Sequence, residues 1–332
     1  MSPIPPTVGA EQQQQQEKPE ATQASVTMHT VAGTDESFGQ ETQTTEPHSV
    51  PASDMGMGLG RHHRKIYFMR HAERMDKIFP GWVQLAFTDK SRYRPYDLNQ
   101  PLSLPKREEP ERAYYWDTPI TEIGHVTAQM VGRGMRLQHE QLSRVYASPA
   151  LRCLQTAEAV LKACATSPTV RVRVEPGLFE WMGWYESPPI WMSAEELLAA
   201  GYRVDTDYQP QISAEEMRRD RRRESIREYY QRLQGVTRAV LEQASAAAGS
   251  TLIVGHASTV DAGVRCCLGK ATRQEERQTL DKMSVSYPNC CLVGLEESSK
   301  HKGHWKHIRN ALPQLTYLDA TSRVDQGFLN RA

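Results

Sequence analysis

The run KIYFMRHAER at residues 65–74 decides how the rest of the chain can be interpreted. Its apolar core, residues 66–69, combines a β-branched side chain with two aromatic ones, which is typical of a short buried strand. Arg70 and His71 follow where that strand should end. Ligands bind beyond the carboxyl ends of the strands in an open α/β sheet, so we predict that this pair faces a ligand site. Arg74 lies on the same side if a helical turn follows.

A second run of the same kind, TLIVGHAST at residues 251–259, also places a histidine, His256, at the end of a buried strand. Ser258 is a suitable N-cap for a helix over residues 259–267. A lone Arg-His pair is common and carries little weight. Two parallel strands that both end in histidine can meet at one edge of a sheet, which favours a catalytic interpretation.

The totals narrow the class of protein. The 332 residues allow one or two domains with a sizeable core, and 40 basic side chains balance 40 acidic ones. We therefore expect neither nucleic acid nor a membrane surface as a partner. No apolar run approaches the roughly 20 residues of a membrane span, and no signal-peptide pattern is present. Six cysteines with neither metal-ligand spacing nor disulfide-framework density predict a reducing, cytoplasmic location and no metal site.

The chain divides by composition into two parts. Residues 1–62 are rich in Gln, Thr, Ser and Pro and have too little apolar surface to fold, so we expect disorder. Residues 63–332 should form one domain. Within it, the proline- and aromatic-rich stretch 76–119 is predicted to be an irregular lid or substrate wall. The regular elements expected after it are a helix over 121–138, a strand over 144–148, a helix over 150–164, a strand over 170–174, a helical region over 213–247 and a hairpin over 290–308.

Two further side chains extend the predicted site. Arg152 falls in the first turn of the helix expected over 150–164, where unpaired backbone amides attract anions and a guanidinium suits phosphate. Taken alone, Arg152 is better interpreted as a surface arginine, because phosphate-binding arginines are a small minority, and only the strand-proline-helix setting in company with His71 favours the site. Glu180 stands between two aromatic residues. We expect burial to raise its pKa and keep it protonated as a proton donor near neutral pH.

Together these residues resemble the histidine phosphatase superfamily, which also contains the cofactor-dependent phosphoglycerate mutases. Residues 70–72, Arg-His-Ala, resemble its Arg-His-Gly signature. More closely, the chain resembles the C-terminal phosphatase domains of the ubiquitin-associated and Src-homology-3 domain-containing family, also called suppressors of T-cell receptor signalling, and the insect ecdysteroid-phosphate phosphatases. The resemblance extends over about residues 65–310 and includes YRP at 93–95, ASPALRC at 147–153, VEPG at 174–177, FEW at 179–181, DTDY at 205–208 and HAST at 256–259.

The resemblance implies a three-layer α/β/α fold with a mostly parallel central sheet. It implies that His71 is the nucleophile and becomes a phosphohistidine, that Glu180 is the general acid and base, and that His256 stabilises the transition state. No metal or cofactor is required. The side chains implied in phosphate binding are Arg70, Arg74, Arg152 and His256.

Two departures from the family pattern are present. Ala72 and Ala257 replace the glycine that usually follows each active-site histidine, and we expect activity to survive this smallest possible change. Residues 1–62 are too few and too polar to contain ubiquitin-associated and Src-homology-3 modules, so recruitment through those modules is not implied.

Three functions fit the sequence. The first is a metal-independent phosphomonoesterase that acts on phosphotyrosine proteins or on a bulky small molecule such as a steroid phosphate. The second is a phosphoglycerate-mutase-like phosphotransferase, and the third is a non-catalytic scaffold that binds phosphorylated ligands. We favour the phosphatase because nucleophile, proton donor and second histidine are all present. The resemblance also suggests a homodimer.

Overall fold

The computed structural model describes residues 64–87, 92–220, 223–244, 249–272, 277–317, 320–321 and 326–330. The predicted disordered segment, residues 1–62, lies outside these ranges.

A mixed six-stranded sheet runs through the domain in the order β3-β2-β4-β1-β5-β6. The first four strands are parallel, and β5 and β6 are antiparallel neighbours at one edge. This arrangement confirms the predicted closing hairpin. The strands are β1 (Lys65–Arg70), β2 (Leu142–Ala147), β3 (Val172–Val174), β4 (Ser250–Gly255), β5 (Leu292–Glu297) and β6 (Trp305–His307), and a separate two-stranded sheet pairs β7 (Thr316–Tyr317) with β8 (Ala320–Thr321).

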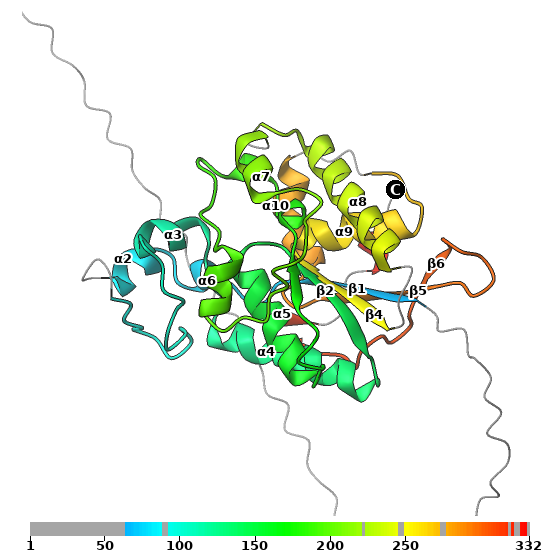
Figure 1. The fold of residues 1–332 in the computed structure, drawn as a ribbon, viewed down its shortest axis with the longest axis horizontal. Coiled ribbons are helices and arrows are strands. Elements are labelled where there is room, and N and C mark those ends of the chain that lie inside the picture. Colours follow the sequence, from blue (N-terminus) through cyan, green and yellow to red (C-terminus); the bar gives the residue numbers. More distant parts are fainter. Residues whose placement is uncertain are drawn as a thin grey trace, which may run out of the picture. The chain divides into compact units, whose positions relative to one another are not determined.

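Helices cover both faces of the sheet (Figure 1). Successive residues of a strand point to opposite faces, so Tyr67 and Met69 pack with α4 and α5, whereas Ile66 and Phe68 pack with α8 and α9. This three-layer α/β/α fold is the predicted class. The described helices are α1 (Met75–Ile78), α2 (Trp82–Ala86), α3 (Pro110–Trp116), α4 (Glu122–Leu137), α5 (Leu151–Ala163), η1 (Pro176–Leu178), η2 (Met182–Trp184), α6 (Ala194–Ala199), α7 (Ala214–Asp220), α8 (Ile226–Gln243), α9 (Ala257–Cys267), α10 (Arg277–Ser286) and α11 (Gln326–Asn330).

The register of β1 and β4 brings the two histidines together. The strands pair in parallel with Arg70 opposite Gly255, so the residue after each strand emerges at the same edge. The backbone N–H of His71 donates to the carbonyl of Gly255 at 2.8 Å, which extends the ladder by one bond. The sheet therefore places His71 and His256 next to each other. This confirms the prediction that the two strands ending in histidine meet at one edge of the sheet.

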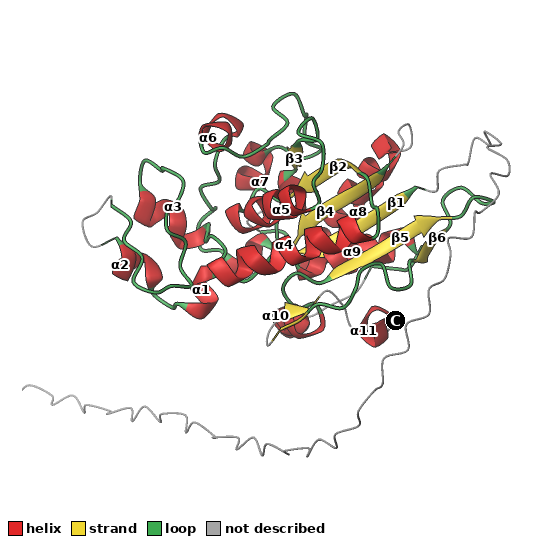
Figure 2. Cartoon of the chain, turned by 90° about the horizontal axis from the view of Figure 1, so that it is seen from below, coloured by secondary structure: helices red, strands yellow, loops and turns green. Residues whose placement is uncertain are grey.

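Two predictions about local structure were wrong, and a third is refined. The stretch 76–119 is not wholly irregular, because α1, α2 and α3 form a group beyond the end of β1 (Figure 2). The helical region predicted over 213–247 is present and is divided into α7 and α8, since Ser225 starts α8 with a capping box to Glu228. The N-cap of α9 is His256 and not Ser258, so the helix begins at the cavity itself.

The close approach of α4 to α5 depends on one glycine. A methyl group at Gly132 would collide with the carbonyl oxygen of Val160 and lie 3.0 Å from the Cβ of Ala163. A methyl group at Gly134, in the same helix, would meet only the Leu312 side chain, at 3.6 Å.

We therefore expect Gly132→Ala to lower the free energy of unfolding by about 1–3 kcal/mol, because the two helices must separate. Gly134→Ala is the matched control, and it should be neutral or stabilising by up to about 1 kcal/mol, since alanine favours the helix. Urea denaturation of the two variants measures the difference. Equal stabilities would contradict the proposed contact.

In the part of the chain that the structure describes, no helix is long and apolar enough to cross a membrane. All six cysteines are free thiols.

Candidate active site

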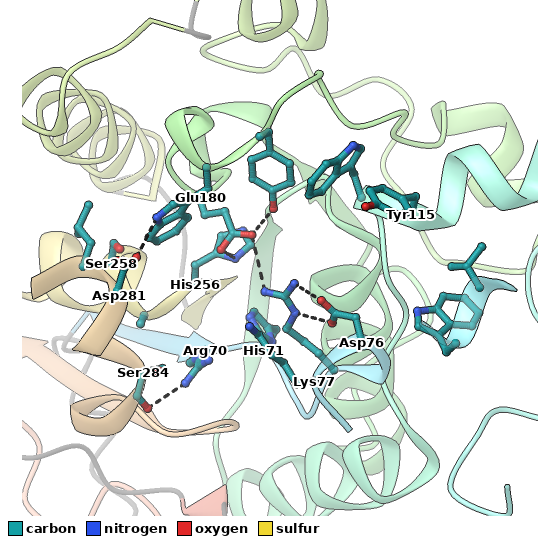
Figure 3. Close-up of a pocket in the computed structure, with 18 of the residues that line it drawn as sticks. Arg70, His71, Asp76, Lys77, Tyr115, Glu180, His256, Ser258, Asp281 and Ser284 are labelled. Atoms are coloured by element: carbon teal, nitrogen blue, oxygen red, sulfur yellow. Dashed lines mark hydrogen bonds and ion pairs between the residues drawn. The ribbon is translucent and has the colours of Figure 1, made fainter. Parts of the chain in front are cut away.

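One cavity of about 620 Å³ lies at the strand edge where the two histidines meet. Among its lining residues are five of the six predicted site residues (Figure 3): Arg70, His71, Arg74, Glu180 and His256. The sixth, Arg152, is fully buried in the first turn of α5 and contacts the site through Glu180. The structure thus brings together all the side chains that the sequence singled out.

The imidazole of His71 is held with one nitrogen free. Its Nδ1 lies 2.8 Å from the carbonyl oxygen of Ala72. Because a carbonyl only accepts, Nδ1 carries the proton and Nε2 keeps a lone pair. Burial first, and then the positive charges of Arg152 and Arg70, hold the pKa of His71 well below its usual range. The ring is therefore neutral near pH 7.

His256 faces His71 across the cavity floor. The two ring centroids are 5.5 Å apart with an interplanar angle of 70°. The Nε2 atom of His256 is hydrogen-bonded to the hydroxyl of Ser148 at 2.9 Å, and Nδ1 lies 3.5 Å from Oε2 of Glu180. Burial and the nearby arginines hold the pKa of His256 well below its usual range. Both histidines are consequently uncharged in an otherwise cationic site.

Two of the three arginines are held in place by neighbours other than Glu180. Nη1 of Arg70 donates to the carbonyls of Ser284 at 3.1 Å and Tyr287 at 2.5 Å, at and just beyond the end of α10. Arg74 makes two hydrogen bonds to the carboxylate of Asp76, at 2.9 and 2.7 Å.

Several donors in this set are unused. Nε of Arg70 and both Nε and Nη1 of Arg152 are buried and have no hydrogen-bond partner among the described residues. Burial lowers the pKa of Arg70 to about 10, so its guanidinium remains charged near neutral pH. Buried unpaired donors are costly, and a bound anion would satisfy them.

The predicted raised pKa of Glu180 was wrong. Burial by itself would raise that pKa, but the guanidinium of Arg152 and the charge of Arg74 outweigh it and hold the pKa far below the usual range. Oε1 of Glu180 pairs closely with Nη2 of Arg152, and Nη1 of Arg74 lies 4.0 Å from it. The carboxylate is therefore ionised in the empty cavity.

The sequence reasoning missed three side chains that hold the site residues in place. The hydroxyl of Tyr185 donates to Oε1 of Glu180, Asp76 fixes Arg74, and Ser148 fixes His256. Ser148 follows the end of a strand and precedes a proline, just as His71 and His256 follow the ends of their strands. That position in the sequence could have indicated a role for Ser148. Nothing local in the sequence marks Tyr185 or Asp76.

Comparison with known proteins identifies the family. A model described as the histidine phosphatase superfamily (branch 1) matches residues 113–303, more than half of the chain. The chain belongs to the histidine phosphatase superfamily. The matched residues include Arg152, Glu180 and His256 and begin after His71.

The relatives of this superfamily member agree with the resemblance seen in the sequence. Ecdysteroid-phosphate phosphatase of Drosophila melanogaster is 36% identical over 248 residues, which are 74% of this chain and 32% of that protein. Ubiquitin-associated and SH3 domain-containing protein B of Homo sapiens is 38% identical over 206 residues, which are 61% of this chain and 31% of that protein. The chain thus spans about a third of the length of these relatives.

A solved structure gives the same family. The ecdysone phosphate phosphatase of Bombyx mori, crystallised in complex with tungstate, superposes with a TM-score of 0.66 at 30% identity. The match covers 80% of this chain and 99% of the silkworm chain.

The two alanines that replace the family's glycines occupy different environments. Ala72 is fully buried, its methyl group belongs to the hydrophobic core, and it does not line the cavity. Its N–H donates to the hydroxyl of Thr156 at 2.9 Å. Ala257, by contrast, lines the cavity as the first residue of α9. Any steric effect on a bound anion would therefore come from Ala257.

Proposed function

We propose that this chain is a metal-independent phosphomonoesterase that works through a phosphohistidine at His71. The observation that supports it most directly is the set of three buried guanidinium nitrogens of Arg70 and Arg152 that have no hydrogen-bond partner among the described residues, in a site with a neutral imidazole. A phosphoryl group supplies the oxygens that these donors lack. The described residues hold no group of three or more His, Cys, Asp or Glu side chains that could bind a metal.

The proposed reaction has two steps. Nε2 of His71 attacks phosphorus in line, the ester P–O bond breaks, and protonated Glu180 gives its proton to the leaving alcohol. In the second step Glu180 takes a proton from water as the water oxygen attacks the phosphohistidine, releasing inorganic phosphate and restoring His71. Arg70, Arg74, Arg152 and His256 would contact the phosphoryl oxygens, and their interactions strengthen as charge develops in the transition state.

The walls of the cavity suggest a bulky, apolar alcohol. Its lining includes five large aromatic side chains and one leucine, namely Trp82, Tyr115, Trp116, Trp184, Tyr185 and Leu280. Such surfaces favour a steroid or phenolic ring over a small polar alcohol, because burying the ring against them removes apolar surface from water and stabilises the complex. We therefore propose steroid-like phosphates and phosphotyrosine side chains as the substrate class, and the relatives named for ecdysteroid phosphate support the first.

A substrate panel tests this proposal. With excess EDTA present, we expect turnover of p-nitrophenyl phosphate, a phosphotyrosine peptide and a steroid phosphate. Glycerol 2-phosphate should be hydrolysed with a kcat/KM at least about tenfold lower, because it buries no ring. A phosphoenzyme that survives for hours would indicate the mutase-like transferase instead. Phosphate binding without turnover of any ester would indicate the scaffold.

The Ser148 hydroxyl offers a finer test of the same mechanism. If Ser148 donates to Nε2 of His256, the proton stays on Nδ1, which lies 3.5 Å from Oε2 of Glu180 and would donate to a phosphoryl oxygen once Glu180 is displaced. We expect Ser148→Ala to lower kcat by about tenfold, the worth of one hydrogen bond. Cys153→Ala is the matched control, because its Sγ lies 3.9 Å from the same Nε2 and makes at most a weak bond. Equal losses in both variants would assign the effect to packing.

The homodimer and the cytoplasmic location stay predictions from the sequence. Sedimentation analysis of the full chain would measure the first, and localisation of the tagged chain the second.

A further inference from the structure

Glu180 is placed between the cavity and the arginine that would bind phosphate most deeply. Arg152 has no exposed surface and does not line the cavity, whereas Glu180 does. The carboxylate of Glu180 pairs with Nη2 of Arg152 through Oε1, the oxygen that also accepts the Tyr185 hydroxyl. A phosphate that bonds to Nη2 of Arg152 must displace this carboxylate.

The charges around Glu180 explain why it occupies that position. It faces Arg152 from α5, Arg74 ahead of α1, His256 at the start of α9 and Tyr185 after η2. Arg74 is already paired with Asp76, and both histidines are neutral, so the positive charges of Arg152 and Arg70 remain. Glu180 balances this charge and pairs directly with Arg152. Glu180 is the counter-ion of the empty site.

A dianion changes this balance. When a tetrahedral dianion bonds to Arg152 and Arg74, it takes over their charge and adds negative charge next to the carboxylate. Both effects favour the protonated carboxyl. The displaced Glu180 would then hold a proton close to the anion, which is the form that a general acid needs.

We propose that the Glu180 carboxylate competes with phosphate for Arg152, and that binding of the anion displaces it and leaves one proton on it. The inference rests on the phosphate site of the proposed function. For a fully ionised anion the proton comes from the buffer, and no bond to the anion forms or breaks. For an ester monoanion the proton arrives with the substrate. The general acid is thus loaded by substrate binding, although it is ionised in the empty cavity.

Tyr185 is a positioning residue in this scheme. Its ring packs against Phe179 at 5.2 Å and Trp116 at 5.4 Å between centroids, which fixes the hydroxyl that donates to Oε1. That donation stabilises the ionised carboxylate. Removal of the hydroxyl should therefore make Glu180 easier to protonate without emptying the cavity wall.

Tungstate is a suitable probe, because it is a tetrahedral dianion that carries no proton near neutral pH. Calorimetric titration in buffers of different ionisation enthalpy counts the protons taken up. For the wild type we expect about one proton per bound tungstate at pH 6. The affinity should weaken by up to about tenfold per pH unit until the pH reaches the pKa of Glu180 in the complex, and should level off above it, where no proton is taken up. Glu180→Gln should bind with almost no uptake and little pH dependence, and tighter than the wild type at pH 8.

Glu186→Gln removes an exposed carboxylate from the same loop and should behave as the wild type. Wild-type binding without proton uptake between pH 5.5 and 8 would overturn the proposal. Uptake that persists in Glu180→Gln would also overturn it, because the proton would then reside on a histidine.

Tyr185→Phe adds a kinetic readout. We expect the basic limb of its profile of kcat against pH to move to higher pH, because Glu180 without the Tyr185 hydrogen bond remains protonated to a higher pH. A uniform loss at every pH would reduce Tyr185 to a structural role and count against the scheme. Binding and turnover distinguish the proposed function from this inference. Proton uptake on tungstate binding without ester hydrolysis would contradict only the proposed function. Ester hydrolysis without proton uptake would contradict only this inference.

Discussion

His71→Ala should lower kcat for p-nitrophenyl phosphate on the order of 10⁴- to 10⁶-fold, the range seen when a catalytic nucleophile is removed. The physical reason is that the described residues lining the cavity offer no other neutral nitrogen with a free lone pair. His256 cannot replace it, because its Nε2 is engaged by Ser148. Turnover measured with excess EDTA gives the result.

The variant needs two companions. His71 is buried, so His71→Asn, which retains a polar group near the Ala72 carbonyl, separates loss of chemistry from loss of folding. His301→Ala removes an exposed histidine that does not line the cavity and should leave kcat unchanged. Acid-labile phosphate trapped on the wild type and absent from His71→Asn would complete the argument. Substantial turnover by both His71 variants would refute the phosphohistidine mechanism.

The second large effect is expected at Arg152. Arg152→Ala should lower kcat/KM by about 10²- to 10⁴-fold. Removal of the buried guanidinium leaves its anionic partner without a compensating charge, and such a loss costs about 3–5 kcal/mol. The variant also removes the charge that keeps Glu180 ionised, so the pKa of Glu180 should rise. Steady-state kinetics as a function of pH measures both effects.

Arg152→Lys is the informative companion, since it keeps the charge and loses the planar fork. It should recover part of the lost kcat/KM but not all. Arg171→Ala, at an exposed position before β3, serves as the control for loss of one positive charge. If Arg152→Lys equalled the wild type, charge alone would be enough and bidentate binding would not be needed.

The sequence by itself determined the frame of the site. Strand periodicity placed His71 and His256 at strand ends, and parallel pairing of β1 with β4 makes those ends coincide. Helix signals located Arg152 in the first turn of α5, although that helix begins at Leu151 with Ala150 as its N-cap. These features depend on neighbours a few residues away, so local pattern is sufficient to predict them.

Only the tertiary structure decided the electrostatics. The pKa of Glu180 depends on Arg152, which is 28 residues away in sequence, and the aromatic neighbours alone gave the wrong direction. Likewise Tyr185 and Ser148 gain their roles only when separate loops meet at the strand edge. Charge interactions act through space in a medium of low polarity, so a protonation state cannot be predicted from adjacent residues in the chain.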